Sequence, residues 1–355
     1  IIGVTRESEE LKSITHEVTD LPTRKAQPQA GLGKGGDSGD IVIEGPSAEQ
    51  YEMFIDEFSR AIMAIRPPLA AALLVLLATV LASACIDGRT EEPLAWSPGE
   101  PVTEPRLFAP GVVSTEDAEE FGLTFSPDGR EVFFTRRYPR ESQRIWTSRW
   151  EGDRWSEPEV APFAQGDRAE TPWMAPDGRT LYFASRRPGA FVDLPDESDN
   201  LWVVERDSTG WGVPRPVRGE VNRPRAERGG WPEAHELNPA LGPDGALYYW
   251  SELPDRGTEG DILRAEPRED GSFGPGEPLR WPVNTEGAET HFAFGPGGVL
   301  VFQSYGLPGS IGYSDLYVTF PSDEGWSAPR ALPEPVNSSA DELFPSFSPD
   351  GRYLF

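Results

Sequence analysis

A repeat of about fifty residues dominates the sequence after residue 100 and restricts the chain to a small set of folds. Each repeat holds an apolar string, a Pro-Asp-Gly or Pro-Gly-Gly turn, and a second apolar string. The strings run over residues 124–134, 173–183, 240–249, 293–302 and 346–355, and their prolines lie 49, 67, 53 and 53 residues apart. Because proline fixes φ and glycine accepts positive φ, each string predicts a β-hairpin.

Two further signals recur after each hairpin. Short strand-like strings come first, over residues 144–147, 200–203, 261–264 and 315–318, and an aromatic turn follows each at Trp155, Trp211, Phe273 or Trp326. Four strands in a unit of this length predict a blade that buries its faces only against neighbouring blades. We therefore expect an all-β protein, a β-propeller of four-stranded antiparallel blades.

The pattern resembles the TolB-type, WD-like β-propeller repeat of bacterial envelope proteins over residues 104–355. The resemblance implies the propeller fold and carries little information about function. Residues 104–110 match the fourth strands that end later units, but no hairpin precedes them. We expect this segment to be the outer strand of the last blade, closing the ring by pairing with the C-terminal part of the chain.

The chain starts Ile1-Ile2 and stops at Phe355 within a predicted strand, which indicates a fragment truncated at its C-terminus. Residues 104–355 are thus expected to hold four full blades, the closing strand and a partial blade. For the intact protein we expect six blades, with seven as the alternative.

Acidic residues outnumber basic ones 59 to 32, a formal net charge of −27. This balance excludes a nucleic-acid partner, because neutralising phosphates requires a surplus of Lys and Arg. A single Cys excludes an intramolecular disulfide and a thiolate zinc cluster. His235 and His291 flank two repeat carboxylates, but nothing in their spacing brings them together, so we expect neither a metal site nor a cofactor.

Residues 63–85 resemble a bacterial lipoprotein signal peptide. Met63 would be the start and Arg66 the positive end, and an uncharged run of 16 residues over 69–84 leads to Cys85. That run is shorter than the roughly 20 residues of a membrane-spanning helix. The resemblance implies a lipid on Cys85 that anchors the protein to a membrane of the cell envelope, at a periplasmic or outer-membrane surface. A short signal anchor or a buried apolar helix is the alternative.

The expected domain boundaries follow from these segments. Residues 1–62 form an upstream segment outside the mature protein, 63–85 the signal peptide, 86–103 a flexible linker and 104–355 the incomplete propeller. The upstream segment is interpreted as an upstream frame translated past the true start. Alternatively, it is a small cytosolic segment.

A carboxylate precedes the hairpin proline by six or seven residues in every unit. These residues are Glu120, Glu170, Glu236, Glu289 and Glu342. Because the innermost strand of a blade starts near the mouth of the channel, we expect a ring of acids there. We favour a structural role, in which each carboxylate accepts backbone N–H bonds from the adjoining connection. The alternative is that the ring binds a cation or a cationic peptide.

The longest insertions, residues 186–199 and 215–234, are expected on the same face, opposite the Pro-Asp-Gly turns. They carry the candidate ligand-binding residues Arg186, Arg187, Arg215, Arg218, Arg223, Arg225 and Trp231. Guanidinium and aromatic groups together suit an anionic or sugar ligand. The alternative is a solvated loop whose arginines pair with nearby acids.

These observations predict a non-catalytic, envelope-anchored propeller that binds an envelope protein or a glycan through its inserted-loop face. No catalytic residue is assigned. The alternative is the propeller part of a hydrolase. That enzyme would be a prolyl-oligopeptidase-like peptidase whose catalytic domain follows Phe355, or a glycan hydrolase acting through channel carboxylates.

Overall fold

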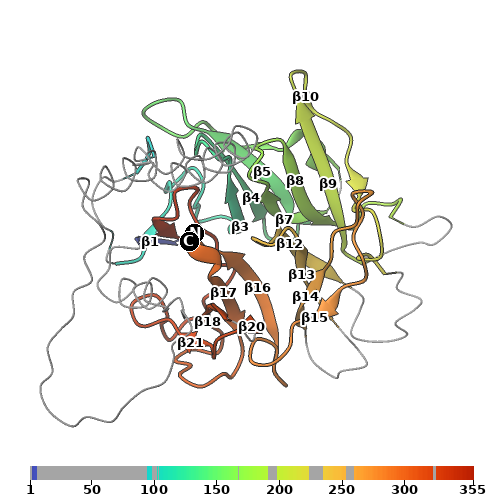
Figure 1. Ribbon diagram of the computed structural model, residues 1–355. Coiled ribbons are helices and arrows are strands. Elements are labelled where there is room, and N and C mark those ends of the chain that lie inside the picture. Colours follow the sequence, from blue (N-terminus) through green and yellow to red (C-terminus); the bar gives the residue numbers. More distant parts are fainter. Residues whose placement is uncertain are drawn as a thin grey trace, which may run out of the picture. The chain divides into compact units, whose positions relative to one another are not determined.

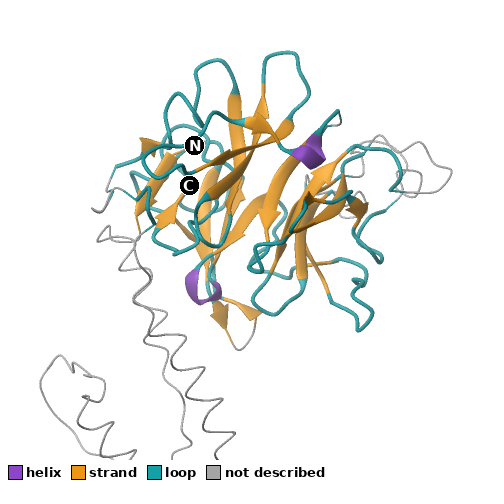
Figure 2. Cartoon of the chain, turned by 90° about the horizontal axis from the view of Figure 1, so that it is seen from above, coloured by secondary structure: helices purple, strands orange, loops and turns teal. Residues whose placement is uncertain are grey.

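Antiparallel β-sheet makes up nearly all the regular structure of this protein (Figure 2). The computed structural model describes residues 2–5, 94–97, 102, 104–166, 168–190, 198–223, 235–252, 260–322 and 325–355, with backbone only for 2–5. Helix in these ranges is confined to the 3-10 turns η1 (Pro162–Ala164) and η4 (Pro296–Gly298). None of the described helices has the length and apolarity needed to cross a membrane. Residues 22–92, which include Cys85, lie outside the described residues.

Four sheets follow one another along the described chain, each with its strands in sequence order from the inside outward. Sheet 1 contains β3 (Glu119–Phe125), β4 (Glu131–Arg137), β5 (Arg144–Arg149) and β6 (Glu159–Val160). Sheet 2 contains β7 (Ala169–Met174), β8 (Thr180–Ser185) and β9 (Asn200–Asp207), and both β10 (Gly210–Trp211) and β11 (Arg215–Pro216) pair with β9.

The next two sheets repeat this order. Sheet 3 contains β12 (Glu236–Leu241), β13 (Leu247–Ser251), β14 (Asp261–Ala265) and β15 (Glu277–Pro278). Sheet 4 contains β16 (Glu289–Phe294), β17 (Leu300–Ser304), β18 (Asp315–Thr319) and β21 (Arg330–Ala331), and a small hairpin joins β19 (Pro321–Ser322) to β20 (Gly325–Trp326).

The sheets are arranged as blades around a common centre (Figure 1). The first strand of each sheet is innermost, and β7 contacts β3 on one side and β12 on the other. The predicted all-β propeller of four-stranded antiparallel blades is therefore confirmed for the described part of the chain.

The predicted hairpins form at the Pro-Asp-Gly turns. In the first, the Gly129 amide donates to the Ser126 carbonyl at 2.8 Å, and the backbone of Gly129 has a φ of 67°. The side chain of Asp128 accepts from the Arg130 amide at 3.1 Å. Proline, the acidic side chain and glycine thus each satisfy one local requirement of the turn.

The hydrophobic core lies between neighbouring blades. Side chains alternate along each strand, so successive residues pack on opposite faces. On β9, Trp202 and Val204 pack against sheet 1, whereas Leu201 and Val203 pack against sheet 3. A blade therefore buries both of its faces only when it has a neighbour on each side.

A three-stranded antiparallel sheet joins distant parts of the chain, in the order β2 (Arg106–Leu107), β1 (Ile2–Thr5) and β22 (Tyr353–Leu354). The expected closing strand, residues 104–110, shares this sheet with the C-terminal strand. The two do not pair directly, however, because the backbone of β1 lies between them. β22 corresponds to the second strand of the last blade and β2 to its fourth strand. The position of the third strand lies between them, and β1 occupies it.

Candidate functional site

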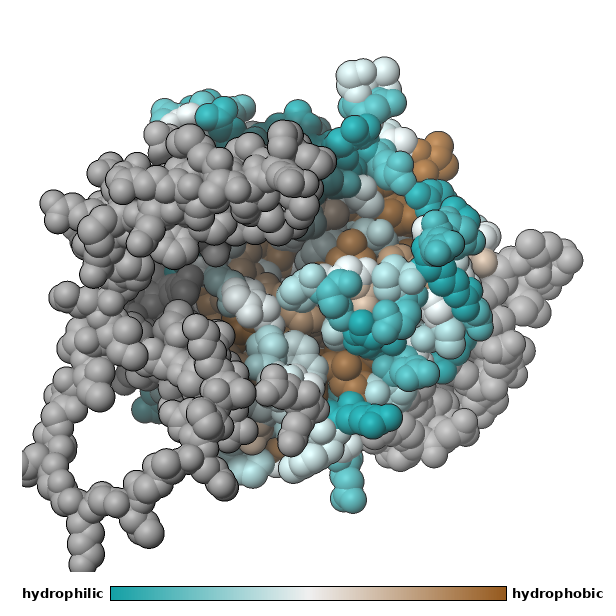
Figure 3. All heavy atoms as spheres, in the orientation of Figure 1, coloured by the Kyte–Doolittle hydropathy of each residue, from teal (hydrophilic) through white to brown (hydrophobic). Residues whose placement is uncertain are grey.

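The first strands of the blades begin around a cavity of about 940 Å³. Its walls come from the starts of β3, β7, β12 and β16, the ends of β4 and β13, and the connections that lead into the first strands. The Pro-Asp-Gly turns lie at the other ends of these strands. The cavity therefore belongs to the end of the propeller where the connections 186–199 and 215–234 join their strands. Apolar residues (brown in Figure 3) gather towards the middle of the face in view, and mostly polar residues (teal) lie to the right of them.

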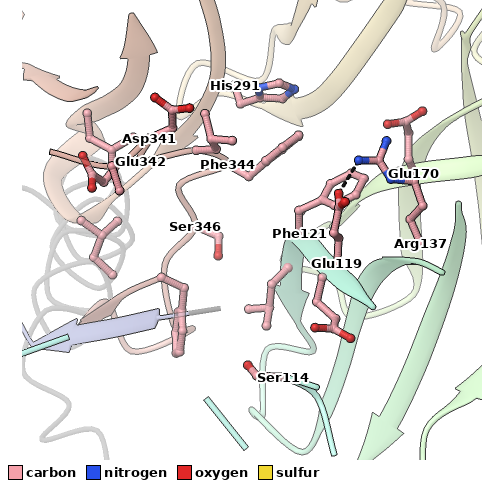
Figure 4. Close-up of a pocket in the computed structure, with 18 of the residues that line it drawn as sticks. Ser114, Glu119, Phe121, Arg137, Glu170, His291, Asp341, Glu342, Phe344 and Ser346 are labelled. Carbon is pink, nitrogen blue, oxygen red and sulfur yellow. Dashed lines mark hydrogen bonds and ion pairs between the residues drawn. The ribbon is translucent and has the colours of Figure 1, made fainter. Parts of the chain in front are cut away.

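Four aromatic rings from different blades form a row in this cavity, and Figure 4 labels three of them, His291, Phe344 and Phe121. The ring centroids of Trp250 and His291 are 5.9 Å apart, and those of His291 and Phe344 are 3.6 Å apart. Phe344 continues the row to Phe121, with the centroids 4.6 Å apart. All four side chains are half-buried. The row offers ring edges and faces to any molecule that enters.

A backbone irregularity in the first strands places two of these rings. The register of the first strand against the second shifts just after the repeat carboxylate in each of the four described sheets. The residue five positions before the hairpin proline has positive φ at Gly122, Thr171, Asn238 and Phe344, and His291 occupies the same position in sheet 4. A bulge redirects the side chain that it carries. Here the redirected residues meet one another around the axis, as in the 3.1 Å bond from the Asn238 amide to Thr171 Oγ1.

His291 presents a hydrogen-bond acceptor at this site. Its Nδ1 lies 3.0 Å from Gln303 Oε1, while Gln303 Nε2 donates to the Tyr305 hydroxyl at 2.6 Å. With the amide so oriented, Nδ1 carries the proton and Nε2 keeps its lone pair. Burial lowers the pKa of His291 to about 4, so the ring is neutral at pH 7. No described residue donates a hydrogen bond to Nε2.

Three of the repeat carboxylates, Glu120, Glu289 and Glu342, bind the connection just before their own strand. Glu289 accepts from the Thr285 amide and hydroxyl, each at 2.8 Å, and from Ser304 Oγ at 2.9 Å. The amide and hydroxyl of Thr115 donate to Glu120 in the same way, and those of Ser338 donate to Glu342. On β3 and β16, these bonds tie the start of the first strand to the preceding connection. Burial raises the pKa of Glu289, and its hydrogen bonds only partly offset this effect.

The other two repeat carboxylates bind side chains instead. Glu170 accepts from Gln143 at 2.9 Å and from Arg168 at 2.6 Å. Glu236, which is fully buried, lies 3.7 Å from Arg223 Nε. The five carboxylates therefore share a position in the repeat without sharing one set of partners.

Acidic groups outnumber basic ones in the cavity. Its lining includes five carboxylates and two guanidinium groups: Glu119, Glu120, Glu170, Asp341, Glu342, Arg137 and Arg168. Both arginines are already paired, Arg137 with Glu119 and Arg168 with Glu170. Within the described residues, no cationic side chain pairs with Asp341 or Glu342. The cavity therefore offers mainly hydrogen-bond acceptors and negative charge.

A charged cluster borders the cavity where sheets 2 and 3 meet. Asp199 lies 3.1 Å from Arg186 Nε and 3.0 Å from His235 Nδ1, and Arg168 bridges it to Glu170. Burial opposes ionisation of Asp199, but the His235 hydrogen bond and the two arginines outweigh it and lower its pKa. Burial and the nearby Asp199 charge raise the pKa of Glu170. Burial works against protonation of His235, yet its bond to Asp199 raises its pKa.

No metal site emerges from the residues that the structure describes, since no three His, Cys, Asp or Glu side chains are grouped to hold an ion. His235 contacts Asp199, whereas His291 belongs to the aromatic row. The structure thus places the two histidines in different environments.

The predicted arginines contact separate partners. Arg187 is buried, donates to the Phe163 carbonyl at 2.8 Å and lies over the Phe183 ring. Arg215 pairs with Glu205 at 2.5 Å, and Arg218 contacts Asp270 at 3.4 Å.

Arg186 and Arg223 pair with two acids whose backbones are hydrogen-bonded to each other. Their partners Asp199 and Glu236 are joined by a 2.9 Å bond from the Glu236 amide to the Asp199 carbonyl. Arg225 and Trp231 lie outside the described residues. A ligand-binding role for these seven residues stays a prediction.

Sequence reasoning missed the aromatic row. Phe121, His291 and Phe344 lie one or two positions after the repeat carboxylate, and aligning the repeats at that position would have found them. Trp250 is paired with Leu237 across the first hairpin of sheet 3. No signal in the sequence shows that this end of a second strand reaches the cavity.

No family model matches the chain, and no curated protein matches it. Among solved structures it resembles TolB from Acinetobacter baumannii, with a TM-score of 0.41, 18% identity, and coverage of 67% of this chain and 48% of TolB. It also resembles a puromycin-hydrolyzing peptidase of Mycobacterium tuberculosis, with a TM-score of 0.37, 15% identity, and coverage of 66% and 32%.

A family 117 glycoside hydrolase from Zobellia galactanivorans gives a TM-score of 0.38, 14% identity, and coverage of 61% and 70%. The chain thus spans about half the length of TolB and about a third of the peptidase. The propeller assignment comes from the sheets of this chain itself.

Proposed function

We propose that this protein is a non-catalytic binding module that takes a group of a partner protein or glycan into the cavity at the loop-bearing end of its propeller. The observation that carries the proposal is the row of Trp250, His291, Phe344 and Phe121, half-buried in a cavity of about 940 Å³. Such concave, partly apolar sites with a few convergent polar groups suit ligand binding.

The scaffold supports binding by rigid display. The rings stand on or next to strands whose other residues are packed between blades, so little conformational entropy is lost when a ligand arrives. The neighbouring connections 186–199 and 215–234 would supply additional contacts around the cavity, which is the usual role of loops on a rigid scaffold. Lipid on Cys85 would hold the module at an envelope membrane.

The test uses a peptide array and an array of bacterial glycans, each probed with labelled protein. Wild-type protein is expected to retain a subset of the probes, and Phe344→Leu and Phe121→Leu to weaken that retention at least tenfold with little change in melting temperature. Val213→Ala serves as the control, because Val213 is 90% exposed and does not line the cavity. Retention that is absent, or equal in all variants, would overturn the proposal.

A further inference from the structure

The cavity is lined by groups that complement a positively charged hydrogen-bond donor. Three of its polar groups are acceptors that no described cationic side chain engages: the carboxylates of Asp341 and Glu342, the latter held by Ser338, and Nε2 of His291. Its two guanidinium groups are engaged by Glu119 and Glu170 and add no unpaired charge. An anionic ligand would meet this negative charge without a free cation to bind it.

The aromatic row adds a second and independent feature. Aromatic faces attract cations through the ring quadrupole, and this attraction strengthens where water is partly excluded. Phe344 stands between His291 and Phe121, and Asp341 is only three residues before it in the chain. Figure 4 shows the carboxylates of Asp341 and Glu342 to one side of the aromatic row. A cation entering here meets ring surface and carboxylate together.

From this juxtaposition we propose that the cavity binds an alkylguanidinium or alkylammonium group attached to an apolar or aromatic body. This inference rests on the proposed binding function and specifies its ligand chemistry. The group comes either from an Arg or Lys side chain of a partner protein or from a small organic cation. Its N–H groups donate to Asp341, Glu342 and Nε2 of His291, while its apolar body packs on Phe344 and Phe121.

The test compares two probes of nearly the same shape, phenethylguanidinium and phenethylurea, by isothermal titration calorimetry at pH 7. The charged probe is expected to bind at least tenfold more tightly than the neutral one. Asp341→Asn is expected to reduce the affinity for the guanidinium several-fold and to leave the affinity for the urea unchanged. Glu334→Gln is the control, since Glu334 is exposed in the same connection and does not line the cavity.

A third probe separates the two sources of the ligand. A capped peptide, Gly-Gly-Arg-Phe-Gly-Gly, that binds at least tenfold more tightly than phenethylguanidinium indicates a protein partner, and its citrulline version should lose that affinity. Equal affinity of the peptide and the small probe indicates a small organic cation. Either result supports the binding of a guanidinium or ammonium group in the cavity.

Two results would overturn the inference. If guanidinium and urea bind equally and both depend on Phe344, the cavity binds ligands without selecting for charge, and the proposed function stands alone. If neither probe binds at millimolar concentration, the cation assignment fails, and the array experiment decides the proposed function separately.

Discussion

At the scale of single residues, two adjacent glutamates on β3 show how strand geometry assigns different roles to the same side chain. Glu120 is 4% exposed and pairs with Arg136, itself 5% exposed, at 2.9 Å. Glu119 is 67% exposed and pairs with Arg137 at the cavity edge. Because successive side chains of a strand point to opposite faces, one becomes a buried tie and the other a solvated ion pair.

Glu120→Ala should destabilise the protein by about 3 kcal/mol, since it leaves the buried Arg136 charge without its carboxylate partner. Glu119→Ala, the matched control, should change stability by less than about 1 kcal/mol, as expected for an exposed pair. Urea unfolding followed by tryptophan fluorescence measures both. Equal losses for the two variants would contradict the structural role of the repeat carboxylate.

His291 should make the protein less stable as the pH falls from about 6.5 towards 4. Its folded pKa of about 4 lies below the ordinary value of 6.5, so in this window the unfolded chain binds a proton that the folded protein does not. The stability that comes from this difference in pKa is fully present above pH 6.5 and is lost as the pH falls towards 4. Because the ring is partly exposed, we expect a loss on the order of 2 kcal/mol.

The measurement compares urea unfolding of wild type and His291→Gln at pH 7.5, 5.5 and 4.5. The difference in stability between the two proteins should shrink or reverse as the pH falls, because glutamine does not titrate. A difference that stays constant over this range would show that His291 is not held neutral in the folded state.

At the scale of elements, an asparagine follows each of three blades in the connection to the next. Its side-chain amide bonds the backbone of the blade's third strand, as a residue of a neighbouring strand would. Asn284 accepts from the Ile262 amide at 3.0 Å and donates to the Ile262 carbonyl at 2.9 Å. Asn222 and Asn337 bond Leu201 and Leu316 in the same way. The sequence signal is a Val-Asn pair at residues 221–222, 283–284 and 336–337, which our sequence analysis did not single out.

Asn284→Ala should cost about 2–3 kcal/mol of stability, since it leaves the buried Ile262 amide without a partner, whereas the Ile262 carbonyl keeps its bond from the Leu279 amide. Glu286→Ala, two residues away at an exposed position, should cost less than about 0.5 kcal/mol. Thermal unfolding of both variants checks this. A melting temperature for Asn284→Ala within a degree of wild type would argue against the asparagine as a strand substitute.

At the scale of the whole molecule, stability depends on contacts between units that are distant in the sequence. The large buried rings Phe183 and Phe302 belong to cores shared by two adjacent sheets. The charge of the whole chain, −27, also bears on function. It favours encounter with cationic partners at low ionic strength.

The anchoring proposal is tested on the whole protein in a bacterial host. Cys85→Ala should move the protein from the membrane fraction to the soluble fraction, since a thiol is required for the lipid that would hold it there. Fractionation followed by immunoblotting measures the shift, and Cys85→Ser serves as a second variant. An unchanged membrane fraction in both variants would exclude lipidation of Cys85 as the anchor.

The sequence by itself determined the hairpins, the four-stranded unit and the alternation of buried side chains. These features depend on local chemistry: proline and glycine in a turn such as 127–129, and a two-residue period along a strand such as β9. Only the tertiary structure decided that Trp250, His291, Phe344 and Phe121 meet, because they come from different blades that pack side by side around the axis. The same holds for those predicted arginines that the structure describes, to which the fold gives separate partners.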